Sequence, residues 1–475
     1  MQDKKQPEKM MAKADILLTH GFFLCEDEKE QAVMRPHPPL GLMYLSAYLK
    51  QQSFTVNLFD STFATRPQLY RQIYHSRGGI IGIYTNLMTR PSVLDIIAYA
   101  KTREMTVILG GPESANYVQE YLRYGADYIV SGEGEQTLHL LLKCLLEHGD
   151  PAKIKGISYL NKLNCVISNP PRELPKDLDL YPWPDRKAVN IQQYLDAWHE
   201  HHGESCVSMI TARGCPFKCT WCSHAVFGYS HRRRSPSDCA DELADIMENY
   251  RPSQVWYADD VFTIHYKWLY QYARELDRRR LKVPFETISR ADRMTKTKVL
   301  DTLQHMGCYR IWIGAESGSQ RLLDDMQRRV TIEQIKQATQ AAQQRGIQVG
   351  MFLMWGYGDE QIEDIDETVK QVAQINPDIF LTTVAYPIKG TEFFKANQGN
   401  IQITVDWDKG SDRDLILSHR RSARYYRFAN KYLNAHVAAT RLKASGAVEM
   451  ANRKARHARL ARQLLVASQH ERHLD

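Results

Sequence analysis

The sequence has little that would place it in or across a membrane. Its 475 residues contain no stretch of about 18 uncharged apolar residues, the length at which a helix can span a bilayer. Near the start, the apolar run from Ile16 to Cys25 is interrupted by Thr19, His20 and Gly21. We expect a strand and its loop there, and not a signal peptide. Any membrane contact is therefore expected to be peripheral.

Two other patterns are missing. The nine cysteines show no paired spacing, so the sequence does not indicate a disulfide framework, and we expect a reducing, cytoplasmic location. No catalytic triad or pair of carboxylates marks a hydrolase. With 43% hydrophobic and 25% charged residues, the chain has the composition of a soluble globular protein. Its length is enough for two or three domains.

The positive charge of the chain is concentrated at one end. The formal net charge is +7, but from Gly410 onward 14 Lys+Arg stand against 5 Asp+Glu, which gives +9. The first 409 residues therefore carry a net charge near −2.

Three cysteines lie close together in the sequence, with the spacing C-x3-C-x2-C at Cys215, Cys219 and Cys222. They follow a segment from Cys206 to Ala212 with the pattern of a buried strand, and a helix is expected from Ser235. Four thiolates close the coordination shell of an iron-sulfur cluster or a zinc ion, whereas three leave one position open. The motif predicts a reactive cluster. A zinc site with His224 as fourth ligand and a buried structural trio remain the alternatives.

The residue before the last cysteine adds a family resemblance. Trp221 completes the pattern C-x3-C-x-aromatic-C, and with it the chain resembles the radical S-adenosylmethionine (SAM) enzymes. The resemblance implies a [4Fe-4S] cluster whose open iron binds the amino and carboxylate groups of SAM. Transfer of one electron into the sulfonium then releases a 5'-deoxyadenosyl radical, which is the chemistry of the cofactors and not of the protein.

The first 150 residues alternate between strand and helix patterns. Such alternation predicts an α/β domain with a doubly wound, Rossmann-like parallel sheet, whose strands we expect at Asp15–Thr19, Phe54–Phe59, Gly79–Tyr84, Thr106–Leu109 and Asp127–Val130. Ligands of such sheets bind at the carboxyl ends of the strands. The candidate loops there are Thr85, Asn86 and Leu87; Gly110, Gly111 and Pro112; and Ser131, Gly132, Glu133, Gly134 and Glu135.

These loops, ahead of the cysteine motif, resemble the cobalamin-binding domain of cobalamin-dependent radical SAM proteins, and the segment Pro38 to Leu45 strengthens the likeness. The Asp-x-His-x-x-Gly motif that supplies an axial histidine in many cobalamin proteins is absent. We therefore expect base-off cobalamin without a histidine ligand, with Asn86 and Leu87 at its lower face. The alternative is a degenerate sheet domain that binds nothing.

The rest of the chain divides into three parts. Residues 151–205 are irregular and proline-rich, which predicts a packed linker. Residues 206–400 show six strand-helix units and so predict an open, partial (β/α)6 barrel, the radical SAM core. After the first strand we expect the others at Gln254–Tyr257, Phe285–Ile288, Tyr309–Ile313, Gln348–Met354 and Ile379–Val384. Residues 401–475 are expected to be a basic helical region.

Residues at the carboxyl ends of the barrel strands are candidates for SAM contacts. By the resemblance, Asp259 or Asp260 would meet the methionine amino group, unless the pair only caps the next helix. Arg290, beside Ser289, could hold the SAM carboxylate as a bidentate pair or make a surface ion pair. Glu316, in a Gly-x-Glu-Ser-Gly-Ser pattern, would face the ribose or the amino group. Gly356 ends a segment expected either to pack the adenine or to close the barrel.

The basic region contains a helical pattern. Arg420, Arg424, Arg427 and Lys431 share one face, with an apolar stripe of Tyr425, Phe428 and Tyr432 beside it. We expect the apolar stripe to dock on the barrel, with contact to an anionic membrane as the alternative. Nucleic acid is not expected, because no recognition motif accompanies the charge.

These inferences predict a cobalamin-dependent radical SAM methyltransferase that acts on an unactivated carbon. The rivals are an oxidative cyclase or rearrangement enzyme with the same cofactors, and a non-catalytic cobalamin- or metal-binding protein. A methylthiotransferase is not expected, since Cys25 and Cys144 stand alone and form no second cluster motif. We expect a flavodoxin or ferredoxin as electron donor, and a small-molecule, lipid or peptide substrate.

Overall fold

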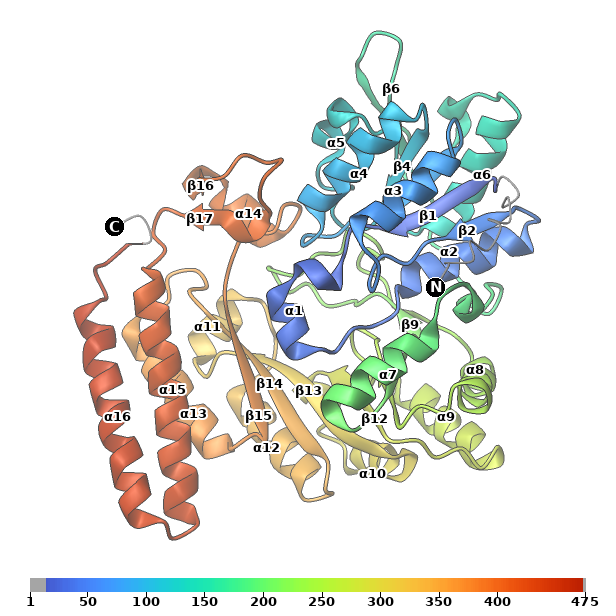
Figure 1. The fold of residues 1–475 in the computed structure, drawn as a ribbon. Coiled ribbons are helices and arrows are strands. Elements are labelled where there is room, and N and C mark those ends of the chain that lie inside the picture. The colour runs from blue at the N-terminus through green and yellow to red at the C-terminus, as the bar shows by residue number, and fades with distance from the viewer. Residues whose placement is uncertain (1–13, 473–475) are drawn as a thin grey trace, which may run out of the picture. The chain divides into compact units, whose positions relative to one another are not determined.

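The computed structural model describes residues 14–472, which form two compact units (Figure 1). The first unit holds the chain up to Glu173 and then Tyr181–Ile191, and the second holds Leu174–Leu180 and the chain from Gln192 onward. The proline-rich segment thus contributes short pieces to both units.

A seven-stranded sheet forms the centre of the first unit. Its strand order is β2-β1-β3-β4-β5-β6-β7, and the first five strands are parallel. The strands are β1 (Ile16–His20), β2 (Val56–Leu58), β3 (Ile80–Tyr84), β4 (Thr106–Gly110), β5 (Tyr128–Val130), β6 (Ile157–Leu160) and β7 (Val166–Ser168). The order of the five parallel strands reverses between β1 and β3, as in doubly wound sheets. The predicted sheet is confirmed.

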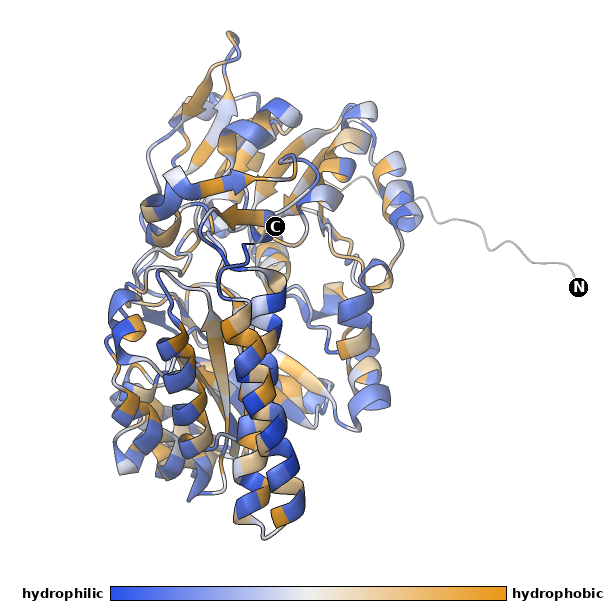
Figure 2. Ribbon diagram, turned by 90° about the vertical axis from the view of Figure 1, so that its left-hand side faces the viewer, coloured by the Kyte–Doolittle hydropathy of each residue, from blue (hydrophilic) through white to orange (hydrophobic). Residues whose placement is uncertain are grey.

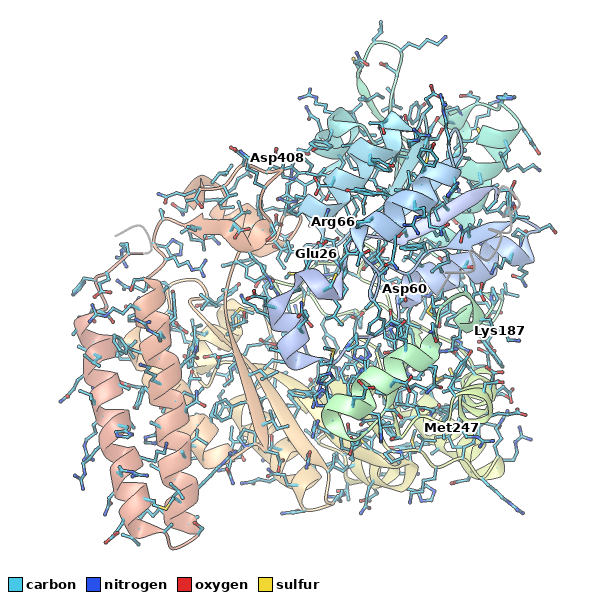
Figure 3. All side chains as sticks on the ribbon, viewed as in Figure 1. Glu26, Asp60, Arg66, Lys187, Met247 and Asp408 are labelled. Atoms are coloured by element: carbon cyan, nitrogen blue, oxygen red, sulfur yellow. The ribbon has the colours of Figure 1, made fainter. Side chains whose placement is uncertain are left out.

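Helices between the strands cover the sheet because their apolar residues recur at helical spacing. They are α1 (Glu28–Val33), α2 (Leu40–Gln51), α3 (Arg66–His75), α4 (Arg90–Thr102), α5 (Val118–Tyr124) and α6 (Gly134–Leu146). On one face, α2 and α6 pack against β1, β4 and β5 through a buried cluster that includes Leu42, Leu49, Leu138 and Leu142. Arg66 at the start of α3 pairs with Glu26 at 2.8 Å, and both are labelled in Figure 3.

The segment expected to be a linker begins as part of this sheet. β6 pairs antiparallel with β5, and β7 pairs antiparallel with β6. The turn between them is held by the side chain of Asn161, which accepts hydrogen bonds from the backbone N–H groups of Leu163 and Cys165, both at 2.9 Å. Two short apolar runs around an asparagine turn are a hairpin signal, and the sequence interpretation passed over it in favour of the prolines that follow.

Six parallel strands form the sheet of the second unit, in the order β15-β14-β13-β12-β11-β8. They are β8 (Cys206–Met209), β11 (Gln254–Tyr257), β12 (Phe285–Ser289), β13 (Cys308–Glu316), β14 (Gln348–Trp355) and β15 (Ile379–Val384). β8 and β15 lie at the two ends of this order and do not pair with each other, so the predicted open (β/α)6 arrangement is confirmed. Because all strands are parallel, their carboxyl ends share one edge.

The helices of this unit follow the strands in alternation. They are α7 (Ile191–His202), which begins at the border of the units, α8 (Pro236–Asn249), α9 (Tyr266–Arg278), α10 (Thr297–Met306), α11 (Gln320–Asp325), α12 (Ile332–Gln343), α13 (Ile362–Ile375) and α14 (Glu392–Asn397). Helix α8 begins where the sequence predicted, because Ser235 caps it by accepting a hydrogen bond from the N–H of Asp238 at 3.2 Å. Two small hairpins, β9 (Ala212–Arg213) with β10 (Arg232–Arg233) and β16 (Ile401–Ile403) with β17 (Leu415–Leu417), complete the strands.

The basic end of the chain is an antiparallel pair of helices, α15 (Ala423–Ala444) and α16 (Val448–Ala467), which lie side by side in Figure 1. Hydrophobic and hydrophilic residues alternate along both helices in Figure 2. Tyr425 and Phe428 are buried, and Asn430 accepts a hydrogen bond from the indole of Trp355 at 2.7 Å. The expectation that this apolar stripe docks on the barrel is confirmed. Within residues 14–472, no helix combines the length and apolar character needed to cross a bilayer.

Gly350 in the middle of β14 makes a test of this packing. An added Cβ would lie 2.3 Å from a ring carbon of Trp312, its partner on β13. We expect Gly350→Ala to destabilise the protein by about 1–3 kcal/mol, because the ring has to shift in a packed interior. Gly399→Ala is the control, since nothing lies within 4 Å of its new Cβ. Thermal unfolding of both variants checks this, and equal midpoints would show that the sheet is not packed as described.

Candidate active site

The three-cysteine loop starts directly after β8, where a carboxylate from the next strand holds it. Asp259, which follows β11, accepts hydrogen bonds from the N–H and hydroxyl of Thr211 at 2.7 and 2.5 Å and from the N–H of Ala212 at 3.1 Å. Its side chain is almost fully buried, and Arg233 lies 3.6 Å away. Both carboxylate oxygens are therefore engaged by the protein, so Asp259 positions the loop. The predicted contact of Asp259 with SAM does not fit this geometry.

The neighbouring Asp260 differs. It is exposed, and desolvation together with the charge of Asp259 raises the pKa of its carboxyl group. Cys215 of the loop lies close enough for its own pKa to be raised by this carboxylate, after desolvation as the main cause. Of the two aspartates, Asp260 is the one whose carboxylate is available to a ligand beside the cysteines.

Two buried arginines face the central cysteine. The Nη1 atoms of Arg290 and Arg328 lie 3.9 and 3.6 Å from the sulfur of Cys219, and both side chains are buried. Desolvation raises the pKa of Cys222 to about 12, and it also raises the pKa of Cys215. Thiols with raised pKa values become ligands only where positive charge stabilises the thiolate. The arginine pair and the iron of a cluster would provide that charge, so the donor set fits an anionic cluster.

The spacing of the donors is also relevant to the kind of metal centre. In the described part of the chain, no three His, Cys, Asp or Glu side chains come together closely enough to hold one metal ion. In an iron-sulfur cluster each thiolate binds its own iron, so the three sulfurs stand further apart than the ligands of a single ion. Cys215, Cys219 and Cys222 together are the three-thiolate donor set of a cluster that keeps one iron open.

Arg290 is held in place from several sides. It donates to Asp292 at 2.9 Å and to the carbonyl of Arg328 at 2.7 Å, and its guanidinium lies 3.6 Å from the ring centre of Phe217. For this arginine, the sequence left open a contact with the SAM carboxylate and a surface ion pair. Burial of the side chain excludes the surface ion pair, and the contact with SAM stays a prediction. Ser289 is likewise engaged, because its hydroxyl lies 2.5 Å from that of Thr263.

Glu316 ends β13 in a strained conformation. The pairing with β14 shifts register between Gly314 and Glu316, and the φ angle of Glu316 is +61°. A non-glycine residue in this region costs about 1–3 kcal/mol and is typical of functional sites. Burial raises the pKa of Glu316 to about 6, opposed by the charges of Arg328 and Arg290. The charge of Glu316 contributes to the raised pKa of Cys222, so the carboxylate lies near the cysteine loop, and the predicted contact with the SAM ribose or amino group stays a prediction.

Arg328 is a site residue that no sequence motif indicated. It donates to the carbonyl of Gly314 at 2.6 Å while it faces Cys219, and its neighbours Gln327 and Arg329 have φ angles of +51° and +52°. This short loop between α11 and α12 carries no motif. The pair of arginines after a helix was the only signal, and a solvated charge pair is the commoner meaning of such a pattern.

Aromatic residues border the loop on the side of β14. Trp221 lies edge-on to Tyr357 with ring centres 6.3 Å apart, and the Tyr357 hydroxyl contacts that of Thr220. Gly356 faces elsewhere: an added Cβ would fall 2.4 Å from the hydroxyl oxygen of Tyr426 on α15. One side of Gly356 is thus covered by the C-terminal helix pair, which favours the barrel-closing role that the sequence analysis left open.

In the first unit, hydrogen bonds connect the candidate loops that follow β3 and β4. The hydroxyl of Thr85 donates to the carbonyl of Gly110 at 3.0 Å and accepts from the N–H of Ser114 at 3.1 Å. Gly111 has a φ angle of +106°, and a Cβ there would lie 2.3 Å from the carbonyl oxygen of Thr85. Only glycine fits, so the backbone itself forms this surface, as a large flat ligand requires. Pro112 follows it, half-buried.

The remaining loop residues lie along the same edge, since β3, β4 and β5 are parallel neighbours. The side chain of Asn86 accepts from the N–H of Met88 at 2.9 Å, which fixes a tight turn, and Leu87 is half-buried. After β5, Glu135 is buried in the first turn of α6, whereas four residues are half-buried, namely Ser131, Gly132, Glu133 and Gly134. The structure brings all three predicted loops to one edge, which fits cobalamin.

His20, at the carboxyl end of β1, already has protein partners. His20, the last residue of β1, lies 3.0 Å from Asp60, which Figure 3 labels, and its other ring nitrogen accepts from the N–H of Phe22 at 3.2 Å. Both nitrogens therefore have protein partners. The lack of a histidine ligand to cobalt stays a prediction.

Family models match both units. Residues 32–142 match the B12 binding domain, and residues 209–372 match the radical SAM superfamily. The first match contains the loops after β3, β4 and β5, and the second contains the three cysteines and Glu316.

Known proteins align over most of the chain. An uncharacterized methyltransferase of Pyrococcus horikoshii is 27% identical over 80% of this chain and 83% of its own length. The anaerobic magnesium-protoporphyrin IX monomethyl ester cyclase of Rubrivivax gelatinosus is 26% identical over 78% of this chain and 68% of its own.

Among solved structures, the radical SAM methyltransferase TsrM from Kitasatospora setae is similar in fold. It has a TM-score of 0.69 and 17% identity, over 82% of this chain and 79% of that one. A B12 binding domain ahead of a radical SAM domain, with three cysteines on the loop after the first barrel strand, places this chain in the cobalamin-dependent radical SAM family, whose cofactors are a [4Fe-4S] cluster, SAM and cobalamin.

Proposed function

We propose that this enzyme transfers a methyl group to an unactivated carbon of an organic substrate and uses two molecules of SAM per turnover. The bound cofactors supply the chemistry: the cluster delivers the electron that cleaves one SAM, and cobalamin carries the methyl group taken from the other. The hydrogen removed from the substrate leaves in 5'-deoxyadenosine, methionine is released from the same SAM, and the other SAM leaves as S-adenosylhomocysteine. Each turnover takes two electrons from an external donor, one for SAM cleavage and one for returning cobalamin to the state that accepts a methyl group.

The protein's own residues bind and position. Cys215, Cys219 and Cys222 hold the cluster, while Arg290 and Arg328 balance its negative charge next to Cys219. A ligand on the open iron would find two carboxylates nearby. Asp260 and Glu316 are therefore assigned to the amino and ribose groups of SAM, which are hydrogen-bond donors.

One observation carries the proposal. The same chain contains the three-cysteine loop in its second unit and, in its first unit, a sheet edge with loops of the kind that bind cobalamin. The Pyrococcus relative named as a methyltransferase and the fold likeness to TsrM support methyl transfer as the reaction. No base or nucleophile is required for the carbon-centred step, so the lack of a triad in the sequence is in keeping with it.

Oxidative cyclisation is the second candidate. It is favoured by the likeness to the Rubrivivax cyclase, which extends over both units. Both reactions release 5'-deoxyadenosine, but only methyl transfer consumes SAM to S-adenosylhomocysteine. The third alternative, a non-catalytic binding protein, would show neither product.

Substrate and partners are also proposals. We propose that the substrate is a small molecule, a lipid or a peptide, and that flavodoxin or ferredoxin donates both electrons. We further propose that cobalamin binds base-off with Asn86 and Leu87 at its lower face. Contact of the basic C-terminal region with an anionic membrane is the remaining alternative. If it occurs, deletion of residues 410–475 should abolish binding to anionic liposomes.

The first prediction concerns SAM cleavage. After anaerobic reconstitution with iron, sulfide and cobalamin and with a strong reductant, the wild type should form both 5'-deoxyadenosine and S-adenosylhomocysteine. Cys219→Ala should lose the first product, because its cluster lacks one of three ligands. Cys165→Ala is the control, since this thiol is exposed on the β6–β7 turn. Chromatography of both products is the measurement.

The outcomes separate the candidates. Formation of 5'-deoxyadenosine alone would reject methyl transfer and favour cyclisation. Zinc in the purified site with neither product would reject the enzyme altogether.

The second prediction compares two adjacent aspartates. Asp259→Asn should lower the iron and sulfide content after reconstitution, because the amide can no longer accept all of the hydrogen bonds that fix the loop at Thr211 and Ala212. Asp260→Asn should keep the cluster but weaken SAM binding about tenfold, the loss of one charge-assisted hydrogen bond. Metal analysis and equilibrium dialysis with SAM check this. Equal cluster loss in both variants would contradict the division of roles.

The third prediction tests the cobalamin edge with two glycines of positive φ. Gly111→Ala should prevent cobalamin loading, because its Cβ would lie 2.3 Å from the Thr85 carbonyl. Gly78→Ala carries similar backbone strain, at a φ of +68°, but has nothing within 4 Å of the new Cβ. It should load cobalamin like the wild type. The absorption spectrum after desalting reports loading, and full loading of Gly111→Ala would argue against this edge as the site.

A further inference from the structure

A cavity of about 340 Å³ lies beside the carboxyl end of β14 in the second unit. Its lining includes Gly358, Glu360, His419, Arg421, Tyr426 and Arg472. None of the cysteines, Glu316, Arg290 or Arg328 lines it. Its volume falls within the range of small-molecule sites.

The cavity is separate from the cysteine loop. Gly356 and Gly358 both line the cavity. Tyr357 lies between them in the sequence but faces the cysteine loop, where its hydroxyl contacts Thr220 and its ring lies edge-on to Trp221. On the cavity side, the ring of Tyr426 packs against Gly356. The end of β14 thus carries two environments, one toward the cluster loop and one toward the helix pair α15 and α16.

Two arginines are held together at this cavity. Arg421 and Arg472 are partners in an antiparallel backbone bridge, which places their side chains on the same face. Arg421 also donates to the carbonyl of Gln469, and Arg472 donates to the carbonyl of His419 at 3.5 Å. Paired guanidinium groups have the planar geometry that suits a carboxylate or a phosphate.

A buried carboxyl group completes the lining. Glu360 is 8% exposed; one oxygen accepts from the N–H of Gly356 at 2.8 Å, and the other is buried with no hydrogen-bond partner among residues 14–472. Burial, and then the charge of Asp364, raise the pKa of Glu360 to about 8. At neutral pH it therefore holds a proton and has an O–H to donate. Asp359 also lines the cavity, but it is exposed and accepts from the amide of Gln361 at 2.6 Å.

We propose that this cavity binds a small anion through a carboxylate or phosphate group, with Arg421 and Arg472 taking the charge and Glu360 donating a hydrogen bond. The site is independent of the proposed methyl transfer. A bound anion would join the end of β14 to the start of α15 and to Arg472, so it would stabilise the docking of the helix pair.

The experiment uses the full-length protein without added SAM. Inorganic phosphate and, separately, succinate are titrated at neutral pH by calorimetry, and thermal unfolding is followed with each. At least one anion should saturate a single site and raise the unfolding midpoint; phosphate alone identifies a phosphate site and succinate alone a carboxylate site. Arg421→Gln and Arg472→Gln should each raise the Kd at least tenfold.

Two controls keep the result specific. Arg427→Gln removes an exposed charge on α15 that does not line the cavity, and it should leave the Kd unchanged. Glu360→Gln keeps an N–H donor and should bind the anion, whereas Glu360→Ala should bind it more weakly. The unfolding midpoint of each variant without anion shows that it is folded.

Three results would overturn the proposal. One is the lack of saturation by either anion up to about 10 mM. Another is an equal loss of affinity in Arg427→Gln, which would mean a general effect of charge. The third is markedly tighter binding in Glu360→Gln, since relief of repulsion would show that Glu360 is an ionised carboxylate and not a donor.

Discussion

The candidate site depends on the compensation of negative charge at Cys219. Its sulfur lies in a buried environment with two guanidinium groups, from Arg290 and Arg328, within 3.9 Å. Buried arginines without such a partner would be costly, and buried thiolates without positive charge would hold their protons. An anionic cluster satisfies both requirements at once. The strained loop around Arg328 and the stacking of Phe217 on Arg290 have the same effect, because each fixes a cation against the cysteines.

Parallel strand order is what brings the other groups to this place. Four site residues come from segments spread over about a hundred residues, namely Asp260, Arg290, Glu316 and Tyr357. Each lies at the end of a strand of one parallel sheet or shortly after it. The same rule acts in the first unit, where the loops after β3, β4 and β5 share an edge. Each unit therefore presents a ligand-binding edge built from short loops on a rigid sheet. In the second unit, the bulge at Glu316 and the carboxylate of Asp259 adjust that edge locally.

Much of this was predictable from the sequence, because hydrophobic runs of four to eight residues between glycines and prolines mark buried parallel strands well. All eleven expected strands are present, with ends shifted by a few residues at most. The cysteine loop could be located because its spacing has few other meanings. The β6–β7 hairpin was missed, since its runs are short and the prolines after it dominate the pattern. Roles of single side chains were harder to predict. The sequence alone cannot distinguish Asp259, whose carboxylate accepts hydrogen bonds from Thr211 and Ala212, from its neighbour Asp260.

The central claim is that three thiolates hold a cluster with one iron open to SAM. Electron paramagnetic resonance of the reconstituted and reduced protein tests it most directly, with spectra recorded before and after addition of SAM under conditions too cold for turnover. The account predicts the signal of a reduced [4Fe-4S] cluster that changes its g values when SAM binds, because the ligand enters the coordination shell of one iron. A cluster signal that SAM leaves unchanged would contradict the open site, and a protein that takes up zinc without forming a cluster would contradict the account as a whole.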